Sequence, residues 1–238
     1  MALAQRELVG ELMDDPGLDW REHARALASL RLLNTVSAAA RPFWPVVRDV
    51  CVRANAQGRP ARVLDVATGS GDVAAGLARR CAGAGIRAEF VVSDISDVAI
   101  GMAEGLWRHA EGSTVRLETV RADALRDDLP ACDIAMCSLF LHHLTDDNAK
   151  LLLRRMADAA PVVAVSDLRR TSLGLALAYT APRIGSASRI VHVDAVRSVR
   201  AAFTPAELGS IAADAGLRGA VVRNVWPQRM FLLWRRPS

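Results

Sequence analysis

Residues 63–72 read VLDVATGSGD, and this stretch decides the fold. An apolar strand pattern leads into a loop with two glycines, Gly69 and Gly71, and helical spacing begins at Asp72. Because they have no Cβ, the two glycines let the backbone approach a ligand closely. The start of the helix points its free amide groups toward that ligand. The stretch therefore predicts a strand, a ligand-binding turn and a helix.

Beyond this stretch, short β-rich runs alternate with helical ones. The predicted strands are residues 62–66, 89–94, 114–121, 132–138 and 161–167, and the predicted helices are residues 72–82, 96–110 and 145–159. This alternation predicts a doubly wound, mostly parallel α/β sheet with helices on both faces. Residues 219–225 and 230–234 are too close for a helical crossover, so we expect an antiparallel C-terminal hairpin at the sheet edge.

The remaining segments predict helices around this sheet. A capping pattern at Asp19–Glu22 begins one helix, residues 42–52 form another, and Thr204–Glu207 begins a third. We expect residues 1–60 to form a helical cover and residues 61–238 the ligand-binding domain. Residues 168–203 exceed the link that this fold needs, so we expect them to be an inserted substrate cover.

Composition excludes several classes of protein. The chain has 238 residues, of which 51% are hydrophobic, which excludes a disordered chain. The net charge is +4, and the basic residues are scattered along the chain without a dense run, so we expect no nucleic-acid partner. The cysteines form no C-x-x-C pair and read as reduced core residues. No apolar run predicts a signal peptide or a membrane span, so we expect a cytoplasmic protein. The sequence leaves open whether it is a monomer or a homodimer.

Two acidic residues end predicted strands. Asp94 ends the second strand and Asp123 the third, at the sheet edge where open α/β sheets bind ligands. A carboxylate at the first position can accept the hydroxyl groups of a ribose, and one at the second can accept the amino group of an adenine. A dinucleotide cofactor also fits this pattern, because Gly69, Gly71 and Ala74 have G-x-G-x-x-A spacing.

Two further acids disfavour a dinucleotide. Asp65 stands inside the strand, where dinucleotide-binding strands are usually apolar, and Asp72 would oppose a pyrophosphate at the helix start. S-adenosylmethionine has no phosphate, and its amino-acid end carries an ammonium group. An acidic rim suits that ligand better.

The sequence resembles the class I S-adenosylmethionine-dependent methyltransferases. Four motifs occur in order over about residues 60–170, namely VLDVATGSGD, VVSDIS, VRADAL and CDIAMCSLFLHHL. The resemblance implies a Rossmann-like sheet of about seven strands and S-adenosylmethionine as cofactor. Ala67 departs from the family, which often has glycine there. By resemblance, the cofactor-binding residues are Asp65, Ala67, Thr68, Gly69, Gly71, Asp94, Ile95, Asp123, Ala124, Ser138 and Leu139.

Within this resemblance, Asp65 orients the loop and the methionine end, and Ser138 and Leu139 lie beside the methionine. Asp94 holds the ribose and Asp123 the adenine. The segments SLFLHHL, SDLRR and SVRAAFTPAEL are similar to small-molecule methyltransferases related to quinone-biosynthesis enzymes, a branch that often serves secondary metabolism.

Two histidines follow the fourth predicted strand. We expect His143 to act as a base or to position the acceptor, with His142 as the other candidate, because a histidine can take the proton of a phenol. The alternative is that one histidine caps the next helix together with Thr145 and the other packs on the sheet. The acids expected of a metal-assisted enzyme are missing from this strand end, so we expect no metal.

The predicted insertion is apolar first and basic afterwards. We expect Tyr179, Arg183, Arg197 and Arg200 to contact an apolar or aromatic acceptor that bears an acidic group. The favoured function is O-methylation of a phenol or similar hydroxyl in a small molecule. C-methylation of a quinone precursor, an NAD-dependent oxidoreductase and a non-catalytic cofactor-binding module remain alternatives.

Overall fold

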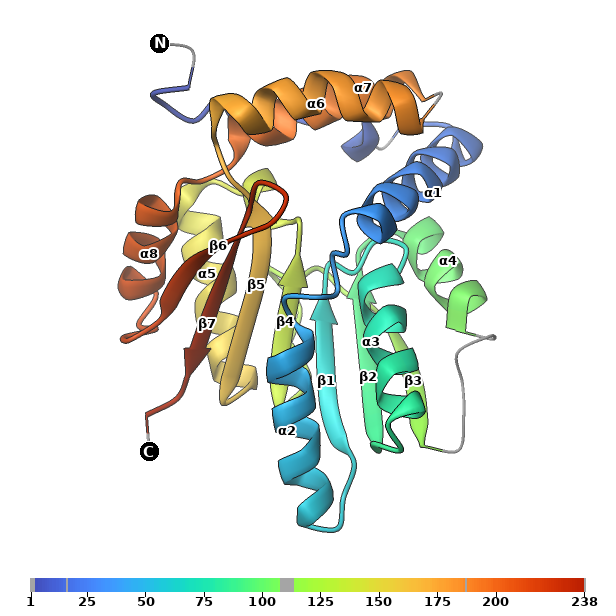
Figure 1. Ribbon diagram of the computed structural model, residues 1–238, viewed down its shortest axis with the longest axis vertical. Coiled ribbons are helices and arrows are strands. Elements are labelled where there is room, and N and C mark those ends of the chain that lie inside the picture. The colour runs from blue at the N-terminus through green and yellow to red at the C-terminus, as the bar shows by residue number, and fades with distance from the viewer. Residues whose placement is uncertain (1–2, 16, 108–113, 187, 238) are drawn as a thin grey trace.

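One seven-stranded sheet carries the fold (Figure 1). The computed structural model describes residues 3–15, 17–107, 114–186 and 188–237. The strand order is β3-β2-β1-β4-β5-β7-β6. The parallel strands are β1 (Ala61–Val66), β2 (Ala88–Asp94), β3 (Val115–Arg121), β4 (Ile134–Ser138) and β5 (Val162–Leu168). The antiparallel strands are β6 (Val221–Val225) and β7 (Arg229–Arg235), and β7 pairs with β5. The predicted doubly wound sheet with an antiparallel hairpin is confirmed.

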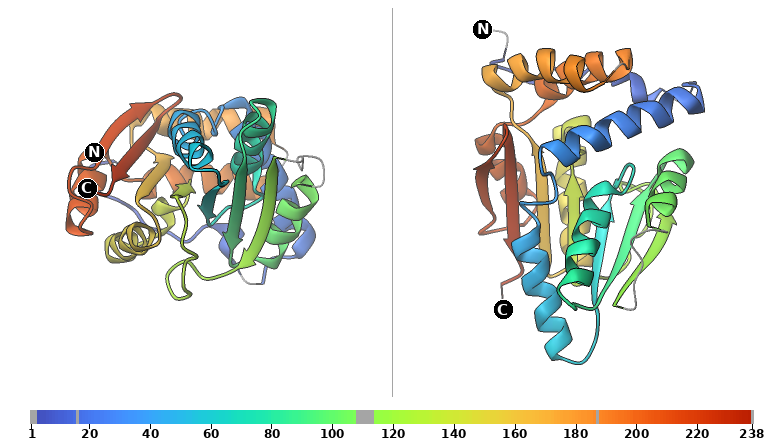
Figure 2. Two further views of the ribbon diagram at one scale, coloured as in Figure 1. Left: turned by 90° about the horizontal axis from the view of Figure 1, so that it is seen from below. Right: turned by 45° about the vertical axis from the view of Figure 1, so that its right-hand side comes forward.

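Helices cover both faces of this sheet (Figure 2). One face packs against α2 (Trp44–Ala56), α3 (Asp72–Gly83) and α4 (Asp97–Trp107). The other packs against α5 (Asp146–Ala159) and α8 (Pro205–Asp214). Burial of apolar side chains on the two faces supplies the main driving force for folding.

A third layer lies over the carboxyl ends of the strands (Figure 1). It contains α1 (Trp20–Val36), α6 (Ser172–Gly185) and α7 (Arg189–Ala201). Two 3₁₀ turns, η1 (Leu12–Asp14) and η2 (Leu141–His143), lie against α7. The predicted insertion, residues 168–203, therefore forms a helical pair above the sheet edge where ligands bind in open α/β folds.

The structure corrects some local predictions. The fourth strand begins at Ile134 because the amide of Cys132 bonds to the carbonyl of Ala159 at the end of α5. At Asp19 the carboxylate accepts from the amides of Arg21 and Glu22, which is the first half of a capping box. Among the described residues, the reciprocal bond to the Glu22 side chain does not form. The box at Thr204 is complete. The predicted helix 96–110 extends to residue 107, and residues 108–110 lie outside the described residues.

The N-terminal sixty residues do not form one unit. In α2, Val47 and Cys51 are fully buried in the same core cluster as Val63 of β1. The predicted division into a cover (1–60) and a domain (61–238) therefore does not coincide with a division of the core. Within the described residues, no helix combines the length and the apolar character required to cross a bilayer.

Candidate active site

The glycine loop joins β1 to α3 through three left-handed residues. Ala67 has φ +52°, Gly69 +57° and Gly71 +73°. A Cβ on Gly71 would lie 2.9 Å from the Cβ of Ala103, so close packing of α4 requires this glycine. A Cβ on Gly69 would meet nothing nearer than a methyl of Leu27 at 3.9 Å. A Cβ would therefore fit beside Gly69, where only the left-handed backbone favours glycine, whereas helix packing also explains Gly71.

Asp65 lies buried beneath this loop. Its Oδ2 accepts a 2.7 Å hydrogen bond from the hydroxyl of Thr68. Burial raises the pKa of Asp65 to about 7, and the hydrogen bond from Thr68 only partly opposes this effect. A cationic group beside this carboxylate would favour its charged form. The site therefore suits the ammonium group of an amino acid.

Asp94 connects β2 to the glycine loop. Its Oδ2 accepts from the amide of Gly69 at 2.9 Å, and its Oδ1 accepts from the amide of Ser96 at 3.0 Å. Burial raises the pKa of Asp94 despite these bonds. The next residue, Ile95, is 61% exposed, which is unusual for a large apolar side chain beside a buried strand end. A carboxylate with spare acceptor capacity beside an exposed apolar side chain suits a nucleoside.

Asp123 follows β3 in a more open position. Its Oδ1 accepts from the amide of Leu125 at 2.9 Å, and Oδ2 lies 3.6 Å from Arg126. Its neighbour Ala124 is buried in the core of the opposite face. The loop after β3 is thus fixed at the same sheet edge as Asp94, two strands from the glycine loop.

β4 ends at Ser138, next to the strand that leads into the glycine loop, and Leu139 follows it. The hydroxyl of Ser138 is buried and has no hydrogen-bond partner among the described residues. The same holds, within that part of the chain, for the hydroxyl of Ser166, its register partner on β5. Leu139 is left-handed, with φ +57°, and its amide donates to the carbonyl of Ser166. Buried polar groups usually have partners, so these two hydroxyls fit a ligand in the adjoining space.

His142 is buried between two carboxylates. It is 3% exposed, and its Nδ1 lies 2.6 Å from Oδ1 of Asp167. Its Nε2 lies 3.5 Å from Oε1 of Glu11. Burial opposes the charged form, but the charge and hydrogen bond of Asp167, helped by Glu11, outweigh it and raise the pKa of His142 to about 10. His142 is therefore an imidazolium at neutral pH and cannot take a proton there.

His143 is more open than its neighbour. Its side chain is 19% exposed, and its ring stacks on Phe140 with centroids 5.9 Å apart. Its Nε2 lies 3.8 Å from Oε2 of Glu11. Ligand atoms of Glu11, His142 and His143 lie within 4.8 Å of one another, but a metal could use this set only after His142 loses its proton, because an imidazolium has no free lone pair. The expectation of no metal stays a prediction.

The sequence analysis missed the N-terminal segment of this site. Residues 3–15 run along α7, and Asp194 of α7 accepts from the amides of Leu12 and Met13 at 2.8 and 3.0 Å. The hydroxyl of Ser198 on α7 donates to Glu11. The buried carboxylate of Glu11 also lies close to Nε2 of His142 and of His143 in η2. No local pattern marks Glu11, because its partners are far away in the sequence.

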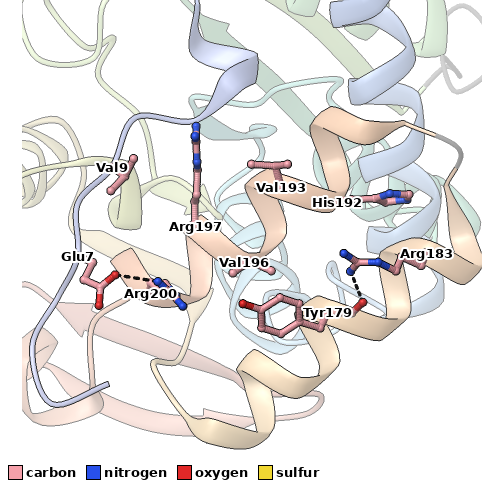
Figure 3. Close-up of a pocket in the computed structure, with 9 residues that line it drawn as sticks. All are labelled: Glu7, Val9, Tyr179, Arg183, His192, Val193, Val196, Arg197 and Arg200. Atoms are coloured by element: carbon pink, nitrogen blue, oxygen red, sulfur yellow. Dashed lines mark hydrogen bonds and ion pairs between the residues drawn. The ribbon is translucent and has the colours of Figure 1, made fainter. Parts of the chain in front are cut away.

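The four residues predicted to contact an acceptor do meet in one pocket (Figure 3). Its volume is about 370 Å³. The lining residues are Glu7, Val9, Tyr179, Arg183, His192, Val193, Val196, Arg197 and Arg200. Helical spacing places the α7 members opposite its buried residues Val191, Asp194 and Ser198, which include the partners of the N-terminal segment. The lining of this pocket includes neither a residue of the glycine loop nor the adjacent pair His142 and His143. The structure therefore groups these four residues but separates them from the rest of the site.

Comparison with protein families supports the resemblance of the motifs. Residues 63–160 match the family described as a methyltransferase domain. This match confirms that residues 63–160, which contain the four motifs, resemble a methyltransferase domain. The sequence matches no curated protein.

Solved structures share the fold. A protein from Nostoc punctiforme to which O-methyltransferase activity is only attributed has a TM-score of 0.64 and 19% identity, over 95% of this chain and 64% of its own. An O-methyltransferase family protein from Burkholderia thailandensis has a TM-score of 0.63 and 18% identity, over 92% of this chain and 62% of its own. This chain thus spans less than two thirds of either. An O-methyltransferase from neocarzinostatin biosynthesis was solved with S-adenosyl-L-homocysteine and 1,4-dihydroxy-2-naphthoic acid. It has a TM-score of 0.53 and 23% identity, over 74% of this chain and 49% of its own.

Proposed function

We propose that this protein transfers a methyl group from S-adenosylmethionine to a hydroxyl group of a small apolar or aromatic molecule. The observation that carries the proposal is the gathering of Asp65, Asp94 and Gly69 at one sheet edge, with a histidine pair after the adjacent β4. The neocarzinostatin-pathway neighbour, with its bound dihydroxynaphthoic acid, supports an aromatic acceptor and a place in secondary metabolism. We propose a cytoplasmic location.

The residues present fit the cofactor. Asp65 and the unpartnered Ser138 hydroxyl suit its amino-acid end, Asp94 the ribose, and Ile95 with Asp123 the adenine. The neighbouring positions Ala67, Thr68, Gly71, Ala124 and Leu139 complete the set. S-adenosylmethionine supplies a methyl group on a positively charged sulfur, which is already activated for transfer.

His143 takes the proton of the acceptor hydroxyl in this proposal. Glu11 lies close enough to stabilise the resulting imidazolium. His142, held in place by Asp167, fixes the turn that carries His143. Alignment of the reacting groups can lower the barrier by roughly 7–11 kcal/mol, and a positioned base adds about 10²–10⁴-fold in rate.

Calorimetric titration with S-adenosyl-L-homocysteine and with NADH tests the cofactor. We expect binding of the first and none of the second, because Asp72 in the first turn of α3 opposes phosphates. Binding of NADH alone would instead support the oxidoreductase.

Mass spectrometry tests the reaction. The enzyme, the labelled donor and a panel of phenols that includes 1,4-dihydroxy-2-naphthoic acid should give a product heavier by one CH₂. Fragmentation then distinguishes O-methylation from C-methylation of a quinone precursor. Saturable cofactor binding without turnover on any acceptor would support the non-catalytic module.

A further inference from the structure

Four polar side chains form a row along the ends of neighbouring strands. Strand alternation places them on the sheet face that packs against α2 and α3, because Val63, Met136, Ala164 and Phe231 point to the same core cluster. Register pairs Ser138 with Ser166, and Ser166 with Phe231. The row runs diagonally across β1, β4, β5 and β7 as Asp65, Ser138, Ser166 and Arg229. Asp65 pairs with Met136, two residues before Ser138, and Arg229 pairs with Leu168, two residues after Ser166.

Arg229 is a buried cation that no described carboxylate pairs with directly. It is 6% exposed, and its Nη2 donates to Oδ1 of Asn34 at 3.0 Å and to the hydroxyl of Ser37 at 2.9 Å. Its Nη1 is buried and has no hydrogen-bond partner in the described part of the chain. Among the described residues no carboxylate forms an ion pair with it; the charges of Asp167 and Asp72 act on it only from farther away. A buried guanidinium without an anion is unfavourable, so the site is built for an anionic ligand.

Arg229 is tied to the start of α3. Asn34, which accepts from Arg229, also favours the charged form of Asp72 at the first position of that helix, which lowers the pKa of Asp72 against the effect of burial. The β6–β7 turn lies at the same edge of the sheet as the tips of β4 and β5 (Figure 1). The guanidinium therefore belongs to the same end of the sheet as the glycine loop, Asp65 and Ser138.

We propose that Arg229 and the hydroxyl groups of Ser166 and Ser138 bind the carboxylate of the amino-acid end of the cofactor, while Asp65 receives its ammonium group. This inference rests on the proposed function. Charge is then complementary at both groups of the amino acid. A bidentate guanidinium–carboxylate pair also fixes the direction of the cofactor. An acidic acceptor could present the same chemistry, so the experiment includes both ligands.

Calorimetry on wild type and Arg229→Gln, with two probes that differ in the amino-acid end, measures what the carboxylate contributes to affinity. S-adenosyl-L-homocysteine carries the amino acid, and 5′-methylthioadenosine lacks it. We expect the variant to bind the first on the order of tenfold more weakly and the second unchanged, since only the first loses a charge-assisted hydrogen bond. Arg235→Gln is the matched control on the same strand, because Arg235 pairs with Asp49 at the surface.

Other outcomes are distinct. Equal loss for both probes, or unchanged binding of both, overturns the inference. So does an effect confined to the KM of an acidic acceptor, which assigns the anion to the acceptor. If Arg229→Gln does not fold, wild type decides the matter: it must prefer S-adenosyl-L-homocysteine over its decarboxylated analogue, and equal affinities reject the carboxylate site. Failure of wild type to bind either adenosine probe refutes the proposed function instead.

Discussion

The imidazole Nδ1 of His142 lies 2.6 Å from Oδ1 of Asp167, and the backbone amide of His142 donates to Oδ2 of the same carboxylate at 3.1 Å. One buried side chain on β5 therefore fixes both the ring and the backbone of the turn that follows β4. Glu11 closes the other side of the ring. This arrangement separates the roles of two adjacent histidines, since one is held between carboxylates and the other is more exposed.

Stability should depend on pH through His142. Its pKa in the folded protein is about 10, above the value of about 6.5 expected when unfolded. The stabilisation from its charge is therefore fully present below about pH 6.5 and is lost as pH rises toward about 10. Urea unfolding of wild type and His142→Gln should show an advantage of wild type that shrinks over this interval. An advantage that stays constant contradicts the buried imidazolium.

The two histidines should differ in catalysis. His143→Ala is expected to lower kcat by about 10²–10⁴-fold, because it removes the proposed base. The affinity for S-adenosyl-L-homocysteine should stay the same. Single-turnover assays at saturating acceptor measure the first effect and calorimetry the second. Full turnover in His143→Ala would show that the reaction needs no base at this position.

Asp94 should contribute to cofactor affinity. Asp94→Ala is expected to weaken the binding of S-adenosyl-L-homocysteine by about 1–3 kcal/mol. The substitution removes the carboxylate proposed to bind the ribose, and it leaves the amide of Gly69 without its acceptor. Asp94→Asn is the matched control, since it retains an acceptor for that amide. An unchanged dissociation constant in both variants removes Asp94 from the site.

The two loop glycines should respond differently to alanine. Gly71→Ala combines a left-handed backbone with a Cβ that approaches Ala103 to 2.9 Å, so we expect a loss of roughly 2–4 kcal/mol in unfolding free energy. Gly69→Ala has the backbone strain alone, at about 1–2 kcal/mol. Denaturant unfolding without ligand compares them, and equal losses contradict the packing role of Gly71.

Cofactor affinity should rise with pH through Asp65. Burial raises the pKa of this carboxyl to about 7 in the free protein, and a bound ammonium group would lower it. Binding then releases a proton, so affinity for S-adenosyl-L-homocysteine should increase from pH 6 to pH 8 by up to about tenfold per proton released. Calorimetry in two buffers with different ionisation enthalpies counts the protons. Asp65→Asn should remove the dependence.

The pocket on the outer side of α7 has its own test. Because it shares no residue with the loop or the histidines, Arg183→Ala and Arg197→Ala should leave S-adenosyl-L-homocysteine affinity unchanged. A raised KM for an acidic acceptor would support the predicted contact between these residues and the acceptor. An unchanged KM assigns this pocket no part in the reaction.

The sequence by itself determined the sheet, the glycine loop and the position of the acids at the strand ends. Apolar runs and helical spacing are local signals, and each is recorded within a short window of residues. Strand direction then brought Asp65, Asp94 and Asp123 to one edge without further information.

Which distant side chains meet around the candidate site depends on how the chain packs. Glu11 reaches the histidines from a segment held by α7, and Arg229 reaches Asn34 across 195 positions of the chain. Nor does spacing reveal that a pocket lies on the outer face of α7, or that His142 has two carboxylate partners. Burial and charge pairing depend on how distant elements pack, and that information is distributed over the whole chain rather than over any one pattern.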